Sequence, residues 1–242
     1  MNLAIKAKQL RNDVLDMCVK AGTGHVSSCF SCVEIMVALF YGNIMKPEDK
    51  FILSKGHASP LLYAILADKG IIDKSELAQF AQPDGKLGVH LDHHILGALI
   101  TSGSLGIGLG IGAGMAMANP QSRIFVLMGD AECQAGSVWE AAMFITKHKL
   151  NNVVAIVDCN TLGVIQEKVD IPYFPSWFCY DINGHDFFML IRSLQSDIST
   201  PLEITARTAK GKGISFMEND WHWHGVAPQG ELAKRAKDEI SA

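Results

Sequence analysis

Hydrophobic residues along the chain form two patterns that alternate with each other. Short apolar runs bounded by turn residues predict strands, and longer segments with apolar residues three and four positions apart predict helices. Because the two alternate, we expect an α/β fold with a doubly wound, mostly parallel sheet and helices on both faces. The expected strands are 51–53, 123–128, 153–158 and 201–208, and the expected helices are 3–20, 31–41, 58–69, 137–149 and 231–240.

Two polar residues follow neighbouring strands in the middle of the chain. Asp130 comes after strand 123–128 and Asn160 after strand 153–158, with a helix between them. This order forms a right-handed parallel crossover, so both residues are expected at one edge of the sheet, where open α/β sheets bind ligands. A carboxylate and an amide oxygen suit Mg²⁺, which completes its coordination with waters and phosphates. The alternative is that both residues only form turns.

The segment 97–118 is rich in glycine and carries no charge. A membrane-spanning helix is one alternative, but Thr101 and Ser102 interrupt the segment and leave a helix of roughly a dozen residues, which is short for a span. Residues 108–113 also give G-x-G-x-x-A, a pattern typical of dinucleotide-binding turns. No good strand precedes these glycines, so a nicotinamide oxidoreductase is the weaker alternative. We expect a buried helix that packs closely against the sheet or a second subunit.

Composition limits the size, the partners and the location of the protein. With 242 residues, of which 48% are hydrophobic, the chain is expected to form one domain over residues 1–242. A net charge of −4 and scattered basic residues argue against nucleic acid or a membrane as the main partner. The N-terminus shows no secretory signal, so we expect a cytoplasmic protein.

The six cysteines follow no disulfide pattern, and we expect reduced thiols. Cys29 and Cys32 form a C-x-x-C pair, but no second pair completes a zinc site. The same segment fits a helix capping box, in which Ser31 and Glu34 satisfy free N–H groups at the start of helix 31–41. A structural role is therefore favoured for this pair.

Several short motifs follow one another along the chain and share an order with those of a known family. Residues 129–134 (GDAECQ), 138–144 (VWEAAMF), 148–150 (HKL) and 156–160 (IVDCN) together resemble the thiamine diphosphate motif of the transketolase family. The other motifs are individually weak, but their shared order covers nearly the whole chain. They are Gly24-His25, 53–57 (LSKGH), 102–106 (SGSLG), 183–186 (NGHD), 210–219 (KGKGISFMEN) and 223–225 (WHG).

The resemblance implies a cofactor site and its ligands. Asp130, Asn160 and the main-chain carbonyl of Leu162 would hold Mg²⁺, or Ca²⁺ or Mn²⁺ in its place, and the ion would neutralise the diphosphate of thiamine diphosphate. Ala131 would donate its backbone N–H to that diphosphate from a helix N-terminus. The other residues implied to bind the cofactor are His57, Gly103, Ser104, Leu105, Gly129 and His224.

Histidines are the implied catalytic and substrate-binding groups. His25 and His224 would flank the substrate, where a positioned imidazole can stabilise an alkoxide and move protons. His90 is a third candidate for substrate binding. For any single histidine, a structural role remains the alternative to a catalytic one.

Some positions depart from the family pattern. Ala131 replaces a usual glycine but keeps its N–H. Ala135 stands where the family often has a glutamate that links cofactor protonation between sites, and Ile107 replaces a usual glutamine. Residues 89–96 depart most and border the substrate region, so the resemblance leaves the choice of sugar open.

The resemblance also implies that half of the enzyme lies elsewhere. Transketolases carry a second domain, which supplies the glutamate that activates the aminopyrimidine, and we expect this domain to be absent from the chain. A separate C-terminal subunit would carry the pyrimidine-binding domain, and two copies of each subunit would associate as a dimer of heterodimers. The complex would transfer a two-carbon ketol unit from a ketose, phosphorylated or otherwise anionic, to an aldose. The alternatives are a related thiamine-dependent carbon–carbon bond-forming synthase and a non-catalytic cofactor-binding module.

Overall fold

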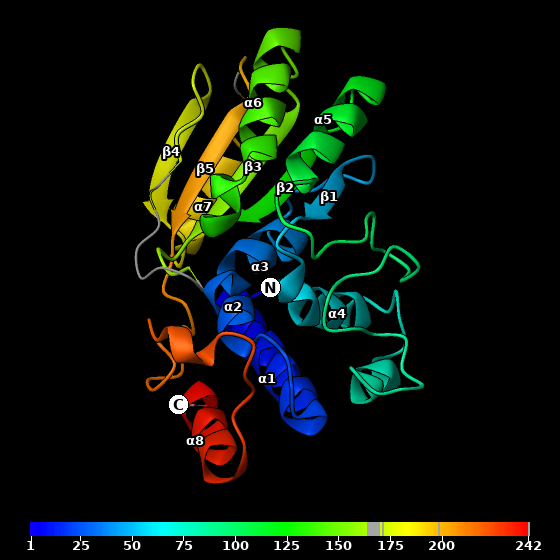
Figure 1. The fold of residues 1–242 in the computed structure, drawn as a ribbon, viewed down its shortest axis with the longest axis vertical. Coiled ribbons are helices and arrows are strands. Elements are labelled where there is room, and N and C mark those ends of the chain that lie inside the picture. Colours follow the sequence, from blue (N-terminus) through cyan, green and yellow to red (C-terminus); the bar gives the residue numbers. More distant parts are fainter. Residues whose placement is uncertain (164–169, 171, 198, 242) are drawn as a thin grey trace.

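A five-stranded parallel sheet forms the centre of the molecule (Figure 1). The computed structural model describes residues 1–163, 170, 172–197 and 199–241. The strand order β1-β2-β3-β5-β4 places the first strand at one edge and the fourth at the other. The strands are β1 (Lys50–Leu53), β2 (Ile124–Gly129), β3 (Val153–Cys159), β4 (Phe178–Asn183) and β5 (Leu202–Arg207).

Helices cover both faces of this sheet, because alternate strand residues point to opposite sides. Ile52, Val126 and Ala155 belong to one apolar cluster, to which α5 and α6 contribute, and the neighbouring strand residues belong to the other cluster. The predicted doubly wound parallel sheet is therefore confirmed. The helices are α1 (Leu3–Ala21), α2 (Val26–Ser31), α3 (Val33–Tyr41), α4 (Ser59–Asp68), α5 (Gly108–Ala118), α6 (Gly136–His148), α7 (Phe187–Leu194) and α8 (Gly230–Ser241).

The unit β2-α6-β3 has the predicted crossover. Gly129 at the end of β2 pairs in register with Asp158 near the end of β3, so both strands end at the same edge of the sheet. β3 is buried along its whole length, as expected for a strand covered on both faces. Helix α6 ends at His148, and the next residue, Lys149, adopts the left-handed conformation and directs the chain toward β3.

The predicted helix 31–41 is wrong at its start. The chain forms two helices here, α2 and α3, separated by Cys32, and neither has a side-chain cap. The Ser31 hydroxyl donates instead to the carbonyl oxygen of Ser28 at 3.0 Å and to the carboxylate of Asp158. Glu34 accepts hydrogen bonds from Arg11 rather than capping the helix. The capping-box interpretation is wrong because both polar side chains form buried hydrogen bonds with other residues instead of with the helix N-terminus.

The cysteine prediction agrees with the structure, in which all six residues are free thiols. Burial raises the pKa of the Cys32 thiol to about 12, which leaves the thiol protonated and poorly reactive at neutral pH.

The glycine-rich segment contains the expected short apolar helix, α5, of 11 residues. Its buried side packs on the sheet, where a Cβ atom at Gly112 would lie only 2.7 Å from the side chain of Val126. None of the helices in the described part of the chain combines the length and the apolar character that a membrane span requires.

Candidate functional site

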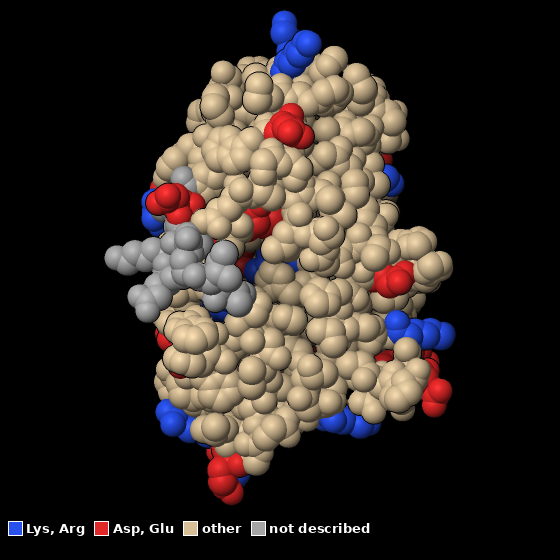
Figure 2. All heavy atoms as spheres, viewed as in Figure 1, with Lys and Arg blue, Asp and Glu red and all other residues tan. Residues whose placement is uncertain are grey.

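A cavity of about 190 Å³ opens at the carboxyl ends of β1, β2 and β3. In the space-filling view, acidic and basic side chains lie at the bottom of a hollow in a largely uncharged face (Figure 2). Most residues that the resemblance implies come together here, although they are far apart in the sequence. They are His25, His57, His90, Gly103, Leu105, Gly129, Asp130, Ala131, Asn160, Leu162 and His224, whereas Ser104 is exposed and is not part of the cavity wall.

Asp130 and Asn160 lie together at the strand ends, as predicted. Asp130 is 2% exposed and Asn160 is 9% exposed. The Asp130 carboxylate accepts hydrogen bonds from the backbone N–H groups of Ala131, at 2.8 Å, and Thr161. Burial, together with the charge of Asp158, raises the Asp130 pKa to about 6, so the carboxylate lacks a full set of neutralising partners. A divalent cation would supply the missing positive charge, and the oxygen donors at this edge fit Mg²⁺.

Ala131 begins a short 3-10 helix, η3 (Ala131–Gln134), at the cavity wall. Its N–H faces the Asp130 side chain, which already accepts that hydrogen bond. An incoming diphosphate would therefore compete with Asp130 for this donor.

Two buried lysines and a buried aspartate lie beneath the cavity. Lys55 pairs with Asp158, which also accepts hydrogen bonds from Ser31 and Thr208. Burial opposes the charged form of Lys55, but Asp158 outweighs it and raises the lysine pKa. Lys210 lacks a carboxylate partner among the described residues, and burial together with Lys55 lowers its pKa to about 8. The cavity floor thus carries a cation that an anionic ligand would stabilise.

Four histidines from four separate segments surround the cavity. His25 is the centre of the group, since its ring centroid lies 5.5 Å from that of His57, 5.6 Å from His90 and 5.0 Å from His224. Burial, with the charges of neighbouring His90 and the two lysines, lowers the His25 pKa to about 4. Its buried Nδ1 atom has no hydrogen-bond partner within the described chain. A neutral imidazole with an unpartnered nitrogen is suited to contact a ligand or to move a proton.

His224 is oriented by Lys210, whose Nζ lies 2.9 Å from His224 Nδ1. Burial and the nearby Lys210 charge lower the His224 pKa to about 4, so the ring is neutral at neutral pH. Because a protonated Lys210 can only donate, His224 accepts through Nδ1 and carries its proton on Nε2. The structure therefore places a hydrogen-bond donor on the other side of this ring.

Glu132 holds the loops around the cavity in place. Its buried carboxylate accepts hydrogen bonds from the Ser54 hydroxyl and from the backbone N–H of Gly106, at 2.9 Å. It also accepts one from the N–H of Gly129, at 3.3 Å. The ends of β1 and β2 and the loop that carries Gly103 are thereby joined through one side chain.

Gly56 allows the segment with His57 to approach this loop closely. A Cβ atom at Gly56 would lie 2.5 Å from the Ser102 hydroxyl oxygen and 2.8 Å from the Gly103 backbone nitrogen. Sequence reasoning assigned no role to Lys55, Lys210, Glu132 or Asp158. Their importance depends on contacts between distant segments, and the only signal in the sequence is that each residue lies within a recognised motif.

The cavity at the strand ends of the parallel sheet contains oxygen atoms suited to bind a metal, buried lysines and neutral histidines. This combination defines a cofactor-binding α/β domain. Residues 3–239 match the family model described as transketolase, thiamine diphosphate binding domain. The chain belongs to the transketolase family through this domain.

Similar proteins fall into two groups by length. The chain is 34% identical to a transketolase of Homo sapiens over 97% of its own length but only 41% of the relative, so it spans about two fifths of that protein. It is 33% identical to a Phocaeicola vulgatus protein that is named as one subunit of an apulose-4-phosphate transketolase, with 99% of this chain and 94% of the relative covered. The crystal structure of a transketolase from Campylobacter jejuni matches with a TM-score of 0.90 at 29% identity, over 100% of this chain and 43% of the other.

Proposed function

We propose that this chain is the diphosphate-binding subunit of a split transketolase, which transfers a two-carbon ketol unit from a ketose to an aldose. The observation that carries the proposal is the joint placement of Asp130, Asn160, Lys210 and the four histidines around one cavity, in a thiamine diphosphate binding domain. In this account the chain forms one domain over residues 1–242, and a separate subunit carries the pyrimidine-binding domain.

The metal and the diphosphate bind at the strand ends. Asp130, Asn160 and the carbonyl oxygen of Leu162 hold Mg²⁺, or Ca²⁺ or Mn²⁺, and the raised pKa of Asp130 supports a cation there. Lys210 lines the same cavity, and its positive charge stabilises the negative charge of the diphosphate. Gly129 and Ala131 approach the diphosphate with their backbone.

The rest of the cofactor and the substrate lie among the histidines. When bound, thiamine diphosphate supplies the nucleophilic carbon and the electron sink that ketol transfer requires. His57, Gly103 and Leu105 contact its rings, while His25, His90 and His224 face the sugar. The low pKa of His224, about 4, supports a role as a neutral hydrogen-bond donor to a sugar oxygen rather than as a cation.

The existence of a partner subunit is supported by the relatives. The Phocaeicola vulgatus protein, whose name makes it one subunit of its transketolase, is covered over 94% of its length, whereas the longer human transketolase is covered over 41%. Each active site would then form between one diphosphate-binding and one pyrimidine-binding subunit, and two such pairs would form a heterotetramer.

Reconstitution tests this function. The chain and a candidate partner that carries a pyrimidine-binding domain would be purified separately, mixed with Mg²⁺ and thiamine diphosphate, and assayed for ketol transfer from ketose phosphates to aldoses. We expect transfer by the mixture and none by either chain alone. Full activity of the isolated chain would contradict the split arrangement, and a cofactor-loaded complex that releases only an aldol or acyl product would contradict ketol transfer.

A further inference from the structure

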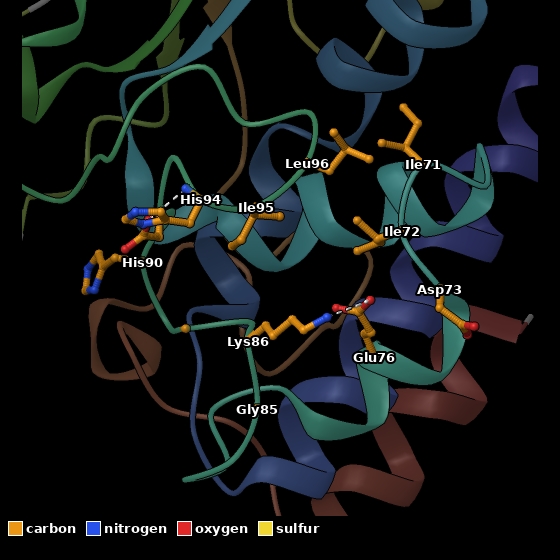
Figure 3. A pocket seen from close by; sticks show the side chains of 12 residues that line it. Ile71, Ile72, Asp73, Glu76, Gly85, Lys86, His90, His94, Ile95 and Leu96 are labelled. Carbon is orange, nitrogen blue, oxygen red and sulfur yellow. Dashed lines mark hydrogen bonds and ion pairs between the residues drawn. The ribbon is translucent and has the colours of Figure 1, made fainter.

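A groove that is larger than the candidate active-site cavity begins at the edge of that cavity. It has a volume of about 660 Å³, and His90 contributes to the walls of both spaces. Figure 3 shows apolar side chains on one side of the groove and the pair formed by Lys86 and Glu76, 3.9 Å apart, on the other. Asp92 and His94 lie along this groove, in the segment that departs most from the family motifs.

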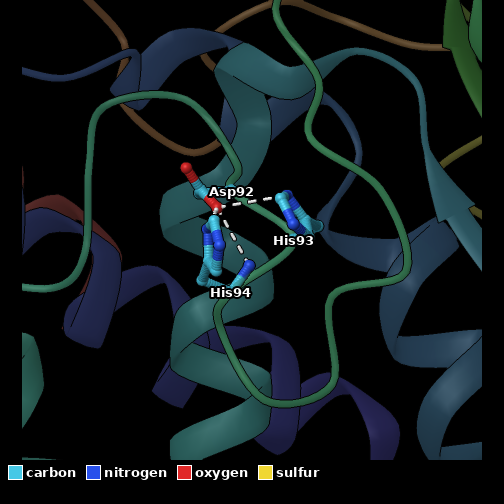
Figure 4. Close-up of side chains that lie close together, drawn as sticks. All are labelled: Asp92, His93 and His94. Atoms are coloured by element: carbon cyan, nitrogen blue, oxygen red, sulfur yellow. Dashed lines mark hydrogen bonds and ion pairs between the residues drawn. The ribbon is translucent and has the colours of Figure 1, made fainter.

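Three consecutive residues, of which Asp92 and His94 line this groove, carry potential metal ligands that lie close together. Asp92, His93 and His94 can each offer one ligand atom, and these atoms lie within 4.8 Å of one another (Figure 4). Asp92 Oδ1 lies 2.6 Å from His94 Nδ1 and 3.5 Å from His93 Nδ1. The two imidazole rings lie together, with centroids 3.9 Å apart. All three side chains are at least half exposed, so an ion can reach them from solvent.

A second turn in the same protein shows what is special about this cluster. The Asp220 carboxylate accepts a hydrogen bond from the backbone N–H of His222, two residues later, at 2.9 Å. The same carboxylate oxygen lies 2.7 Å from Nδ1 of the His222 ring. The corresponding distances at Asp92 and His94 are 2.9 and 2.6 Å. The residue between them is Trp221 in one turn and His93 in the other. The two turns therefore share their local geometry, and only the one at 92–94 has a third ligand.

We propose that Asp92, His93 and His94 form a binding site for a divalent transition metal, with Zn²⁺ as the ion of choice. Two imidazoles and a carboxylate are ligands that Zn²⁺ accepts, at bond lengths of about 2.0–2.2 Å. The site differs in chemistry from the oxygen-rich edge at Asp130, because imidazole favours Zn²⁺, Ni²⁺ or Cu²⁺ over Mg²⁺.

Three protein ligands leave a coordination position open. Because Asp92 and His94 line the groove, a bound ion lies at the wall of a space that adjoins the reaction cavity through His90. Water or an oxygen atom of a groove ligand would fill the open position. This metal site is independent of the proposed ketol transfer and can be tested on the chain alone.

The test is a calorimetric titration of the full, chelator-treated chain with ZnCl₂ in excess MgCl₂, which occupies the oxygen-rich edge. We expect one equivalent of Zn²⁺ per chain, and substitution His93→Gln or His94→Gln should weaken its affinity by about tenfold or more. His222→Gln in the matched turn and Asp130→Asn at the strand edge should leave the affinity unchanged. Titration with Co²⁺ should give the absorption bands of an imidazole-bound ion, and these bands should be lost in the His93 and His94 variants.

Each contrary outcome overturns the proposal. Wild-type affinity no higher than that of the doubly substituted His93→Gln, His94→Gln chain would show that the cluster holds no ion. Equal loss in the His222→Gln variant would show that zinc binds nonspecifically to surface histidines. Because the side chains of His93, His94 and His222 are exposed, their variants should unfold at the wild-type temperature, which calorimetry in the absence of metal checks.

Discussion

Lys210 Nζ lies 2.9 Å from His224 Nδ1 at the wall of the candidate active site. Both side chains have pKa values below the ordinary values of their residue types. Burial and Lys55 lower the Lys210 pKa to about 8, while burial and Lys210 lower the His224 pKa to about 4. The contact therefore keeps the imidazole neutral and fixes which ring nitrogen carries the proton.

Replacement of Lys210 by methionine should raise the His224 pKa toward the ordinary histidine value. The rise should be partial, because burial is the larger cause of the shift and remains in the variant. Titration of the histidine ring protons by NMR measures the change. Exposed His222, whose ring contacts Asp220 rather than Lys210, serves as the internal control. An unchanged His224 pKa would show that Lys210 exerts no influence on the ring.

The buried pair of Arg11 and Glu34 should contribute strongly to stability. Arg11 donates two hydrogen bonds to Glu34, at 2.7 and 2.9 Å, and His185 contacts the same carboxylate at 2.9 Å. Substitution Glu34→Gln should lower the free energy of unfolding at pH 7 by about 3 kcal/mol, because it leaves a buried guanidinium without its counter-charge. Urea denaturation measures this loss, and Glu239→Gln in an exposed pair should cost much less.

The cost of that substitution should depend on pH. Burial disfavours ionised Glu34, but the contacts with His185 and Arg11 prevail and lower its pKa from 4.5 to about 2. A lowered folded-state pKa stabilises the protein above pH 4.5, and the stabilisation declines as the pH falls toward 2. The difference between wild type and Glu34→Gln should therefore shrink in this range. A difference that stays constant down to pH 2.5 would contradict the charge-based account.

Two Gly→Ala substitutions should act in opposite directions. Gly56→Ala places a Cβ atom 2.5 Å from the Ser102 hydroxyl oxygen, so the loop with Gly103 must move, and stability should fall by about 1–3 kcal/mol. Gly114→Ala, on the exposed side of α5 with no atom near its Cβ, should raise stability by about 0.5–1 kcal/mol. Thermal unfolding of the isolated chain compares the two. Equal effects would show that Gly56 is not held by close packing.

Hydrophobic patterning predicted the centre of the sheet and its edge strand β1 but missed the other edge. β2, α6 and β3 were predictable because both strands are nearly continuous apolar runs that are buried on both faces. β4 was missed because most of its residues are polar or partly exposed, as an edge strand allows. Helix α7, which follows it, was missed with it.

The candidate site was predictable only where a motif marked it. Asp130 and Asn160 could be placed from the order of strands and the direction of the crossover. The contact between Lys55 and Asp158 joins residues 103 positions apart, and although each lies within a recognised motif, nothing local in the sequence predicts that the two pair. The capping box at Ser31 failed for the same reason, since Asp158 competes for its hydroxyl. Long-range electrostatic contacts therefore account for most of what the sequence did not disclose.

Metal binding at Asp130 should depend on pH. Since the Asp130 pKa is raised to about 6, the site must release a proton to bind a cation below that pH. Affinity for Mg²⁺ with thiamine diphosphate should fall as the pH drops from 7 to 5 and should change little above pH 7. Calorimetry in buffers of different ionisation enthalpy would detect the released proton. Affinity that does not vary with pH would contradict a metal ligand with this pKa.

The most direct test of the central claim is the titration of thiamine diphosphate into the chain assembled with its partner subunit, with and without Mg²⁺. Wild-type protein should bind the cofactor only with the metal, and Asp130→Asn should weaken binding by at least about tenfold. Asp181→Asn, within edge strand β4 and outside the cavity, should bind normally. Metal-independent binding, or an Asp130→Asn variant that saturates like the wild type, would contradict the assignment of this strand edge as the diphosphate site.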